Sequence, residues 1–229
     1  MIFFINGTEI NFDVNTKEIS FNDRVIKPSV RTYWDMKNIY SESENKDDNE
    51  WLYFMYRWVY LNKEDEELFK ENNLRYDVTI ILPEIIWTEF NKTYWHYHPE
   101  NSSWKKFEEI YEVLSWSALY LQQNNEEVNF TDAFFWDKVV MSESFWHVTI
   151  NPSDEEILVM ANIVDDTFDS EYWEYNSKKW ANYYYKTSWF EKNPNYNDDI
   201  EIIEKDDLFE WGDMYEQFLN NPDKFNFLH

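Results

Sequence analysis

The sequence predicts an all-β protein built as an antiparallel sandwich or barrel, such as a jelly roll. The first observation is a series of short runs, rich in β-branched and aromatic residues, separated by turn-forming residues at spacings of roughly ten. The second is an alternation of apolar and polar residues near the N-terminus, which is typical of half-buried strands. The third is a hydrophobic content of 43% in 229 residues, which supplies a sizeable core.

The N-terminal segment 1–26 alternates apolar and polar residues, which predicts short strands. Turns are expected at Asn6-Gly7 and at Asn15-Thr16, because these residue types tolerate turn conformations. Further along the chain, compact apolar runs bounded by turn-forming residues predict more strands. These runs cover residues 78–82, 89–94, 110–114, 118–122, 138–141, 147–150 and 157–163.

The C-terminal part of the chain has a different character. Residues 207–219 place apolar side chains at helical spacing, which predicts a helix that packs on the barrel. We therefore expect a barrel domain over residues 1–195 and an acidic C-terminal helical extension over residues 196–229. The charged stretch 62–74 is instead expected to be a solvated excursion.

The charge of the chain restricts its partners. It holds 46 Asp and Glu against 20 Lys and Arg, which gives a net charge of −26. Such a chain should avoid nucleic acid and anionic membranes, because both are polyanions. A phosphate site must then be made locally, by a metal, a lysine or backbone N–H groups. A cytoplasmic location is expected, because the sequence shows no membrane span and no signal peptide.

Two histidines, His96 and His98, stand one residue apart in a chain that has only four. In a strand they would point to the same face and could clamp Zn, Fe, Ni or Mn, although exposed or hydrogen-bonded histidines are equally consistent with the pattern. Glu109 and His147 could come from neighbouring strands to complete the set of metal ligands. Three imidazoles and one carboxylate leave coordination positions open for a substrate.

The order and spacing of these residues resemble the paired motif of the cupin superfamily. The first half of the motif matches His96, His98 and Glu109, and the second half matches His147 and Asn151. The resemblance implies the cupin fold, a double-stranded β-helix or jelly-roll barrel, here with N-terminal strands and a C-terminal helical extension.

A narrower resemblance is to the cupin-type, or archaeal-type, glucose-6-phosphate isomerases, and it spans about residues 10 to 195. Several separated motifs occur in the family's order. They are Ser29-Val30-Arg31, Asp35-Met36, Thr79 with Pro83, the run WTEFNKTYWHYH that contains His96 and His98, and Glu109-Ile110-Tyr111.

This resemblance implies a metal-dependent isomerase that interconverts glucose 6-phosphate and fructose 6-phosphate in glycolysis and gluconeogenesis. It implies one divalent metal ion (Fe, Zn, Mn or Ni), a phosphosugar substrate and a homodimer. Glu109 would be both a metal ligand and the proton carrier, although a hydride shift that needs no base stays open. The implied metal ligands are His96, His98, Glu109 and His147, and the implied phosphate contacts are Thr79, Thr93, Trp95 and Tyr111.

Other functions are compatible with the same residues. One is a different cupin enzyme, such as a mannose-6-phosphate isomerase or an epimerase. Another is a non-catalytic, sugar-binding cupin that keeps the fold and the metal. A third is an acidic, aromatic-rich interaction protein without chemistry, which predicts that the four implied metal ligands lie far apart.

The glycine content is anomalous. The chain has 2 Gly and 13 Trp, whereas average usage would give roughly 16 Gly. The isomerase family has glycine at Trp87, Trp95, Trp116, Trp136 and Trp173, and Trp180 and Trp189 match family glycines as well. UGA is read as glycine in some uncultured bacteria and as Trp in some translation tables, so we expect that these positions are glycine. The remaining tryptophans are expected to be ordinary aromatics: Trp34, Trp51, Trp58, Trp104, Trp146 and Trp211.

Overall fold

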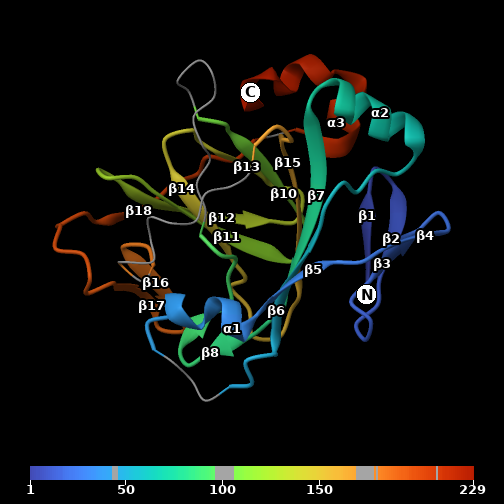
Figure 1. The fold of residues 1–229 in the computed structure, drawn as a ribbon. Helices are drawn as coiled ribbons and strands as arrows, with labels where there is room; N and C mark the ends of the chain where they lie inside the picture. Colours follow the sequence, from blue (N-terminus) through green and yellow to red (C-terminus); the bar gives the residue numbers. More distant parts are fainter. Residues whose placement is uncertain (43–45, 96–105, 169–177, 179, 210) are drawn as a thin grey trace.

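A computed structural model describes residues 1–42, 46–95, 106–168, 178, 180–209 and 211–229, and this part of the chain is mostly β-strand (Figure 1). Its strands form four sheets, and the six-stranded sheet and the sheet that contains β11 and β12 contribute to one shared hydrophobic core. The predicted all-β jelly-roll class is therefore confirmed. Within the described residues, no helix is both long enough and apolar enough to cross a membrane.

The largest sheet has the strand order β13-β10-β15-β7-β6-β5, and all its pairs are antiparallel. Its register places Tyr111 opposite Asn162, and Asn162 opposite Asp77, so these three residues form one row across the sheet. The strands are β5 (Ser29–Thr32), β6 (Trp51–Tyr56), β7 (Leu74–Ile81), β10 (Glu109–Ser115), β13 (Lys138–Met141) and β15 (Leu158–Asp165).

The second sheet has the order β14-β11-β12-β18, and a small third sheet has the order β17-β16-β9-β8. One buried cluster joins side chains of the largest and second sheets, among them Val113, Leu121 and Met160. The strands are β8 (Ile85–Ile86), β9 (Glu89–Phe90), β11 (Ser117–Gln123), β12 (Val128–Phe134), β14 (Trp146–Ile150), β16 (Tyr183–Lys186), β17 (Trp189–Lys192) and β18 (Ile202–Glu204).

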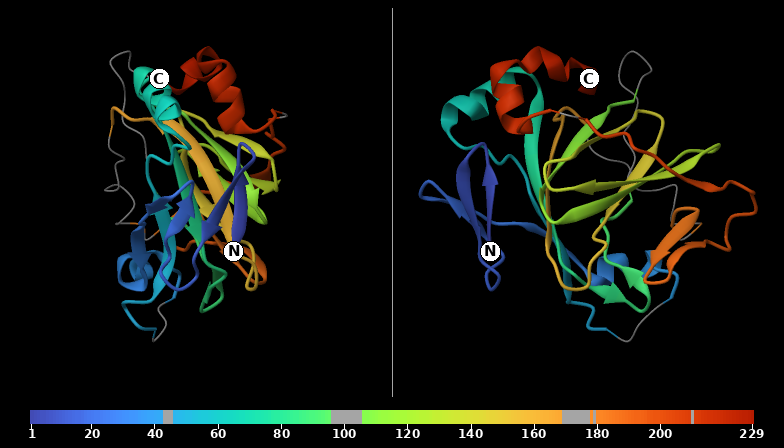
Figure 2. Two further views of the ribbon diagram at one scale, coloured as in Figure 1. Left: turned by 90° about the vertical axis from the view of Figure 1, so that its right-hand side faces the viewer. Right: turned by 180° about the vertical axis from the view of Figure 1, so that it is seen from behind.

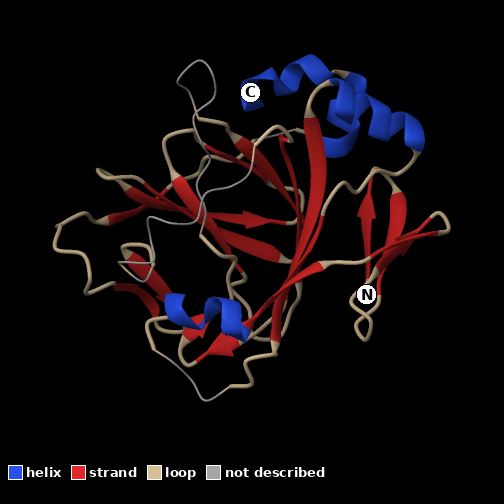
Figure 3. Cartoon of the chain, in the orientation of Figure 1, coloured by secondary structure: helices blue, strands red, loops and turns tan. Residues whose placement is uncertain are grey.

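A second buried cluster covers the other face of the largest sheet, where an N-terminal sheet and the longer helices pack (Figures 2 and 3). Alternate residues of β10 and β7, such as Ile110 and Ile80, belong to this cluster, because successive strand residues point to opposite faces. The elements are β1 (Ile2–Ile5), β2 (Thr8–Phe12), β3 (Ile19–Phe21), β4 (Arg24–Ile26), α2 (Lys63–Glu71), α3 (Met214–Asn220) and η3 (Pro222–Leu228); α1 (Tyr33–Met36) and η1 (Lys37–Ile39) lie before β6.

The predicted N-terminal hairpins are confirmed. Asn6 and Gly7 join β1 to β2 with φ angles of 45° and 70°, which is the pattern of a two-residue turn with both residues left-handed. A turn also occurs at Asn15-Thr16, where the backbone N–H of Asn15 donates to the Asp13 side chain.

Two predictions about helices need correction. Residues 63–71 form α2 rather than a solvated excursion: Asn62 caps the helix by accepting from the backbone N–H of Asp65 at 2.9 Å, and Phe69 is fully buried. The C-terminal helix begins at Met214 rather than near residue 207, because Asp213 caps it by accepting from the backbone of Glu216.

Candidate active site

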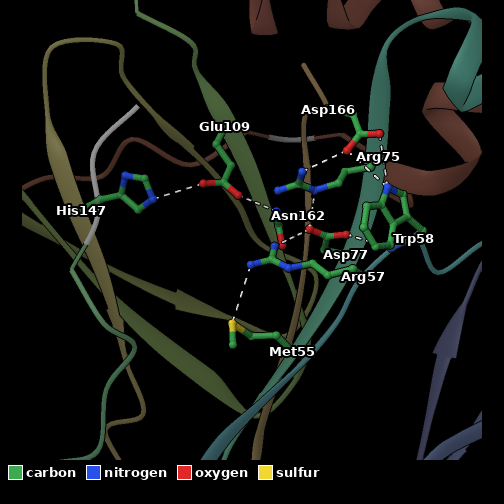
Figure 4. A network of polar contacts seen from close by, with 9 residues as sticks. All are labelled: Met55, Arg57, Trp58, Arg75, Asp77, Glu109, His147, Asn162 and Asp166. Carbon is green, nitrogen blue, oxygen red and sulfur yellow. Dashed lines mark hydrogen bonds and ion pairs between the residues drawn. The ribbon is translucent and has the colours of Figure 1, made fainter. Parts of the chain in front are cut away.

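The site begins at the first residue of β10. Glu109 and Tyr111 are two residues apart on one strand, so both side chains point to the same face of the sheet. The Oε2 atom of Glu109 lies 3.2 Å from Nε2 of His147, which comes from β14 of the second sheet (Figure 4). Both side chains are almost fully buried. Two predicted metal ligands therefore meet between the sheets.

The spacing of these two atoms fits a shared metal ion. Carboxylate oxygens and imidazole nitrogens bind such ions at about 2.0–2.2 Å, so neighbouring ligands at right angles lie about 3 Å apart. His96 and His98, the other two predicted ligands, lie outside the described residues. Within the described residues, no group of three or more candidate ligands is found. The visible part of the site is therefore the pair Glu109 and His147.

Asn162 holds the other oxygen of the carboxylate. Its Nδ2 donates a hydrogen bond of 2.5 Å to Oε1 of Glu109, and Asn162 lies on β15, next to β10. The two oxygens of Glu109 therefore have different neighbours: Asn162 on one side and His147 on the other. A hydrogen bond of this kind restricts the orientation of a carboxylate.

A cluster of paired charges, centred on the buried Asp77, continues from Asn162 along the row (Figure 4). Asp77 on β7 lies between two guanidinium groups: Nη1 of Arg57 is 2.5 Å from Oδ2, and Nε of Arg75 is 2.8 Å from the same oxygen. Burial lowers the pKa of each arginine, and the stronger combined effect of the nearby carboxylates raises it; Asp77 is the largest of these for both, and Asp166 adds to it for Arg75. Arg75 also pairs with Asp166 at 3.0 Å, so two carboxylates balance the two guanidinium groups beside Glu109.

Tyr111 and Thr79, two of the four predicted phosphate contacts, both lie in the largest sheet. Thr79 is two residues after Asp77 on β7 and shares its face, and it is buried. The ring of Tyr111 lies 5.9 Å from the ring of His147. Burial, together with the charge and hydrogen bond of Glu109, raises the pKa of the Tyr111 phenol well above its usual range. The phenol is therefore a neutral hydrogen-bond donor near neutral pH.

Thr93 and Trp95, the other two predicted phosphate contacts, follow β9 and run antiparallel to β14. The backbone N–H of Thr93 donates to the carbonyl of Thr149, and the N–H of Thr149 donates to Oγ1 of Thr93 at 3.1 Å. Lys92 and Ile150 also form an antiparallel bridge. This register carries the segment toward His147, and Trp95 is buried in the core between the sheets.

Lys92 is buried rather than exposed. Its Nζ lies 2.6 Å from Oε2 of Glu89 and 3.8 Å from the centre of the Trp180 ring. Burial lowers the pKa of Lys92, and the charge of Glu89 opposes this effect. The charge of Lys92 is therefore already paired within the protein.

Sequence reasoning did not identify Asn162, Arg57, Arg75 or Asp77. A signal was present in the run RYDVTII, where charged residues stand at alternate positions of an otherwise apolar strand. Charged residues are rarely buried unless they are paired, so such a run indicates a paired network.

The barrel of paired antiparallel sheets, with an imidazole and a carboxylate meeting between them, places the chain among proteins of the cupin class. A family model described as glucose-6-phosphate isomerase (GPI) matches residues 30–201. The chain therefore belongs to the glucose-6-phosphate isomerase family, and the resemblance predicted from the sequence is confirmed.

Among solved structures, similarities are found at low identity. Vicilin from hazelnut (Corylus avellana) is 12% identical, with a TM-score of 0.42 over 64% of this chain and 32% of that chain. Oxalate decarboxylase from Bacillus subtilis, in a structure whose subject is its Mn(II) centres, is 12% identical, with a TM-score of 0.40 over 59% and 31%. Oxalate decarboxylase from Lactobacillus farciminis is 14% identical, with a TM-score of 0.40 over 58% and 33%.

The chain spans about a third of the length of these structures. At such TM-scores nothing follows about ligands or activity, and the fold class rests on the strand pairings described above. None of the curated proteins compared with the chain matches it.

Proposed function

We propose that the protein is a metal-dependent isomerase that interconverts glucose 6-phosphate and fructose 6-phosphate. The observation that supports this most is the approach of Glu109 to His147, 3.2 Å apart and buried between two sheets, in a chain of the glucose-6-phosphate isomerase family. Under this proposal His96 and His98 complete the ligand set for one divalent ion of Fe, Zn, Mn or Ni.

The chain's own residues have distinct tasks in this proposal. A bound divalent ion would polarise the substrate carbonyl. Glu109 would carry the proton between C1 and C2 in an enediol route, whereas a hydride shift would leave it only as a ligand. Tyr111 would contact the substrate phosphate with its hydroxyl, which in the absence of substrate hydrogen-bonds to Glu109. Thr79, Thr93 and the backbone of Trp95 would bind the phosphate.

The test combines metal binding with activity. We expect the metal-free protein to bind one Mn²⁺ per chain and the loaded protein to convert fructose 6-phosphate to glucose 6-phosphate, with loss of activity in EDTA. Glu109→Gln should weaken metal binding and abolish turnover, because it removes an anionic ligand and the proton carrier. Glu108→Gln is the matched control, because it removes the neighbouring carboxylate, which lies just before β10 and is not a predicted metal ligand. Normal metal binding and turnover in Glu109→Gln would contradict the proposal.

A substrate panel separates the other possibilities. Preference for mannose 6-phosphate would indicate a mannose-6-phosphate isomerase, and metal and sugar binding without turnover would indicate a sugar-binding cupin. The homodimer and the cytoplasmic location stay predictions, and sedimentation of the metal-loaded protein tests the first of them.

A further inference from the structure

Six tryptophans adopt a backbone conformation that favours glycine. Among the described residues, the non-glycine residues with positive φ number eleven, and the five that are not Trp are Asn, Asp or Lys. Asn and Asp are several-fold enriched in this region, but a bulky residue there is an outlier. The six are Trp58 (φ 54°), Trp87 (60°), Trp116 (70°), Trp136 (75°), Trp180 (147°) and Trp189 (124°).

Four of the six lie in short connections between strands: two of these connections join paired strands, and two pass between the six-stranded sheet and the sheet of β11 and β12. Trp87 lies between β8 and β9, Trp116 between β10 and β11, Trp136 between β12 and β13, and Trp189 at the start of β17. Each of these side chains is exposed by more than a third. Short connections between antiparallel strands commonly need positive φ, which glycine supplies without strain. The rings of Trp136 and Trp189 contact neighbouring side chains, but none of the four side chains is buried in the core, so burial does not require tryptophan at these connections.

Trp180 is buried but poorly accommodated. Its φ of 147° lies in a region that is almost restricted to glycine. Within the described part of the chain, its Nε1 is buried without a hydrogen-bond partner. A buried indole N–H normally finds an acceptor, because leaving it unpaired is unfavourable.

We infer that these six positions carry glycine in the protein made by its own cell, which reads UGA as glycine. The backbone angles support this independently of the isomerase proposal. The sequence predicted glycine at five of these positions. It predicted an ordinary aromatic at Trp58, but the positive φ of this residue assigns it to the glycine positions as well. Trp173 lies outside the described residues, and Trp95 does not have a positive φ. The tryptophans that remain without positive φ are Trp34, Trp51, Trp146 and Trp211.

The gene and the natural protein test the inference directly. We expect UGA codons at all six positions and UGG at Trp34 and Trp51. In peptides of the protein isolated from its source cells, each of the six sites should be lighter than the tryptophan form by the difference between an indolylmethyl group and a hydrogen. A UGG codon, or a tryptophan mass, at these sites would overturn the inference.

A second test uses as its parent the protein with the printed sequence, in which all 13 of these residues are tryptophan. Trp116→Gly should raise the Tm by about 2–4 °C, because it removes strain at a positive φ. Trp51→Gly is the matched control: Trp51 is similarly exposed, at 41% against 46%, but it lies in a strand without positive φ. The control should lower the Tm, since glycine weakens strands. A Tm that falls equally in both variants would contradict glycine at 116.

A different observation, the hydrogen bond from Asn162 to Glu109, carries a second inference. We propose that Asn162 is a positioning residue that directs the Oε2 atom of Glu109 toward His147; this rests on the proposed function. Asn162 lies opposite the buried Asp77 in the sheet, and Asp77 pairs with the half-buried Arg57 (Figure 4). This pair limits the places that the Asn162 amide can occupy.

The test measures metal affinity as well as activity. Asn162→Ala should weaken Mn²⁺ binding about 10–100-fold, as is usual for groups that orient metal ligands. Asn129→Ala is the matched control, because this buried amide also donates to a carboxylate, that of Glu127, in the other sheet. Unchanged Mn²⁺ affinity in Asn162→Ala would overturn this inference. If Glu109→Gln also binds Mn²⁺ normally, the proposed function fails as well.

Discussion

Glu112 and Lys138 form an ion pair that is almost completely hidden from solvent. Their charged atoms are 2.9 Å apart, and each side chain is 1% exposed. Glu112 also accepts a hydrogen bond from the backbone N–H of Met214, so the pair joins β10 and β13 to the start of α3. Burial raises the pKa of Glu112 to about 7, although Lys138 opposes this effect.

This pKa predicts a pH-dependent contribution to stability. The folded state binds the Glu112 proton more tightly than the unfolded state, so the stabilisation is complete below the ordinary carboxyl pKa of 4.5 and is lost as pH rises through about 7. We expect the free energy of unfolding of the parent, relative to Glu112→Gln, to fall by up to about 3 kcal/mol between about pH 5 and pH 8. Urea unfolding at both pH values measures this, and an unchanged difference would refute it.

At the level of elements, Tyr215 is one of the residues that attach helix α3 to the rest of the protein. The hydroxyl of Tyr215 accepts from the backbone N–H of Leu61 at 2.9 Å and donates to Oδ2 of Asp65, in α2, at 2.9 Å. Its ring also contacts Phe69 of α2 and Tyr76 of β7. The C-terminal helix is therefore joined both to α2 and to the largest sheet.

Removing this hydroxyl should destabilise the protein. Tyr215→Phe leaves the buried N–H of Leu61 without its acceptor and removes one of the two donors to Oδ2 of Asp65, so we expect a loss of about 1–3 kcal/mol in the free energy of unfolding. Tyr185→Phe, on the half-buried strand β16, serves as the control and should change stability by less than about 0.5 kcal/mol. Equal effects of the two substitutions in denaturant titrations would show that the hydroxyl does not support the helix.

At the scale of the whole molecule, the dominant feature is the net charge of −26. Self-repulsion of like charges opposes a compact state, and dissolved salt screens it. We therefore expect the Tm to rise when NaCl increases from about 0.01 M to about 0.15 M, over which the screening length falls from about 30 Å to about 8 Å. Thermal unfolding followed by circular dichroism checks this, and a Tm that falls with salt would show that attractive pairs dominate.

Much of the sheet structure could be predicted from local pattern. The N-terminal hairpins, β13 and most of β10, β11 and β15 follow from apolar runs between turn residues. Strand β12 (Val128–Phe134) was missed, because its polar residues Asn129 and Thr131 are buried and interrupt the apolar pattern. Helix α2 was missed because charged residues dominate it, while one buried apolar side chain, Phe69, packs against α3.

The sequence by itself determined the family, the candidate ligands and most positions where tryptophan replaces an expected glycine, because these depend on residue types and their spacing. Only the tertiary structure decided that Glu109 meets His147 and that Asn162, Asp77 and two arginines stand behind it. These residues are far apart along the chain, and the pairing and facing of sheets bring them together. Backbone angles, which depend on how each turn joins its strands, added Trp58 to the glycine positions.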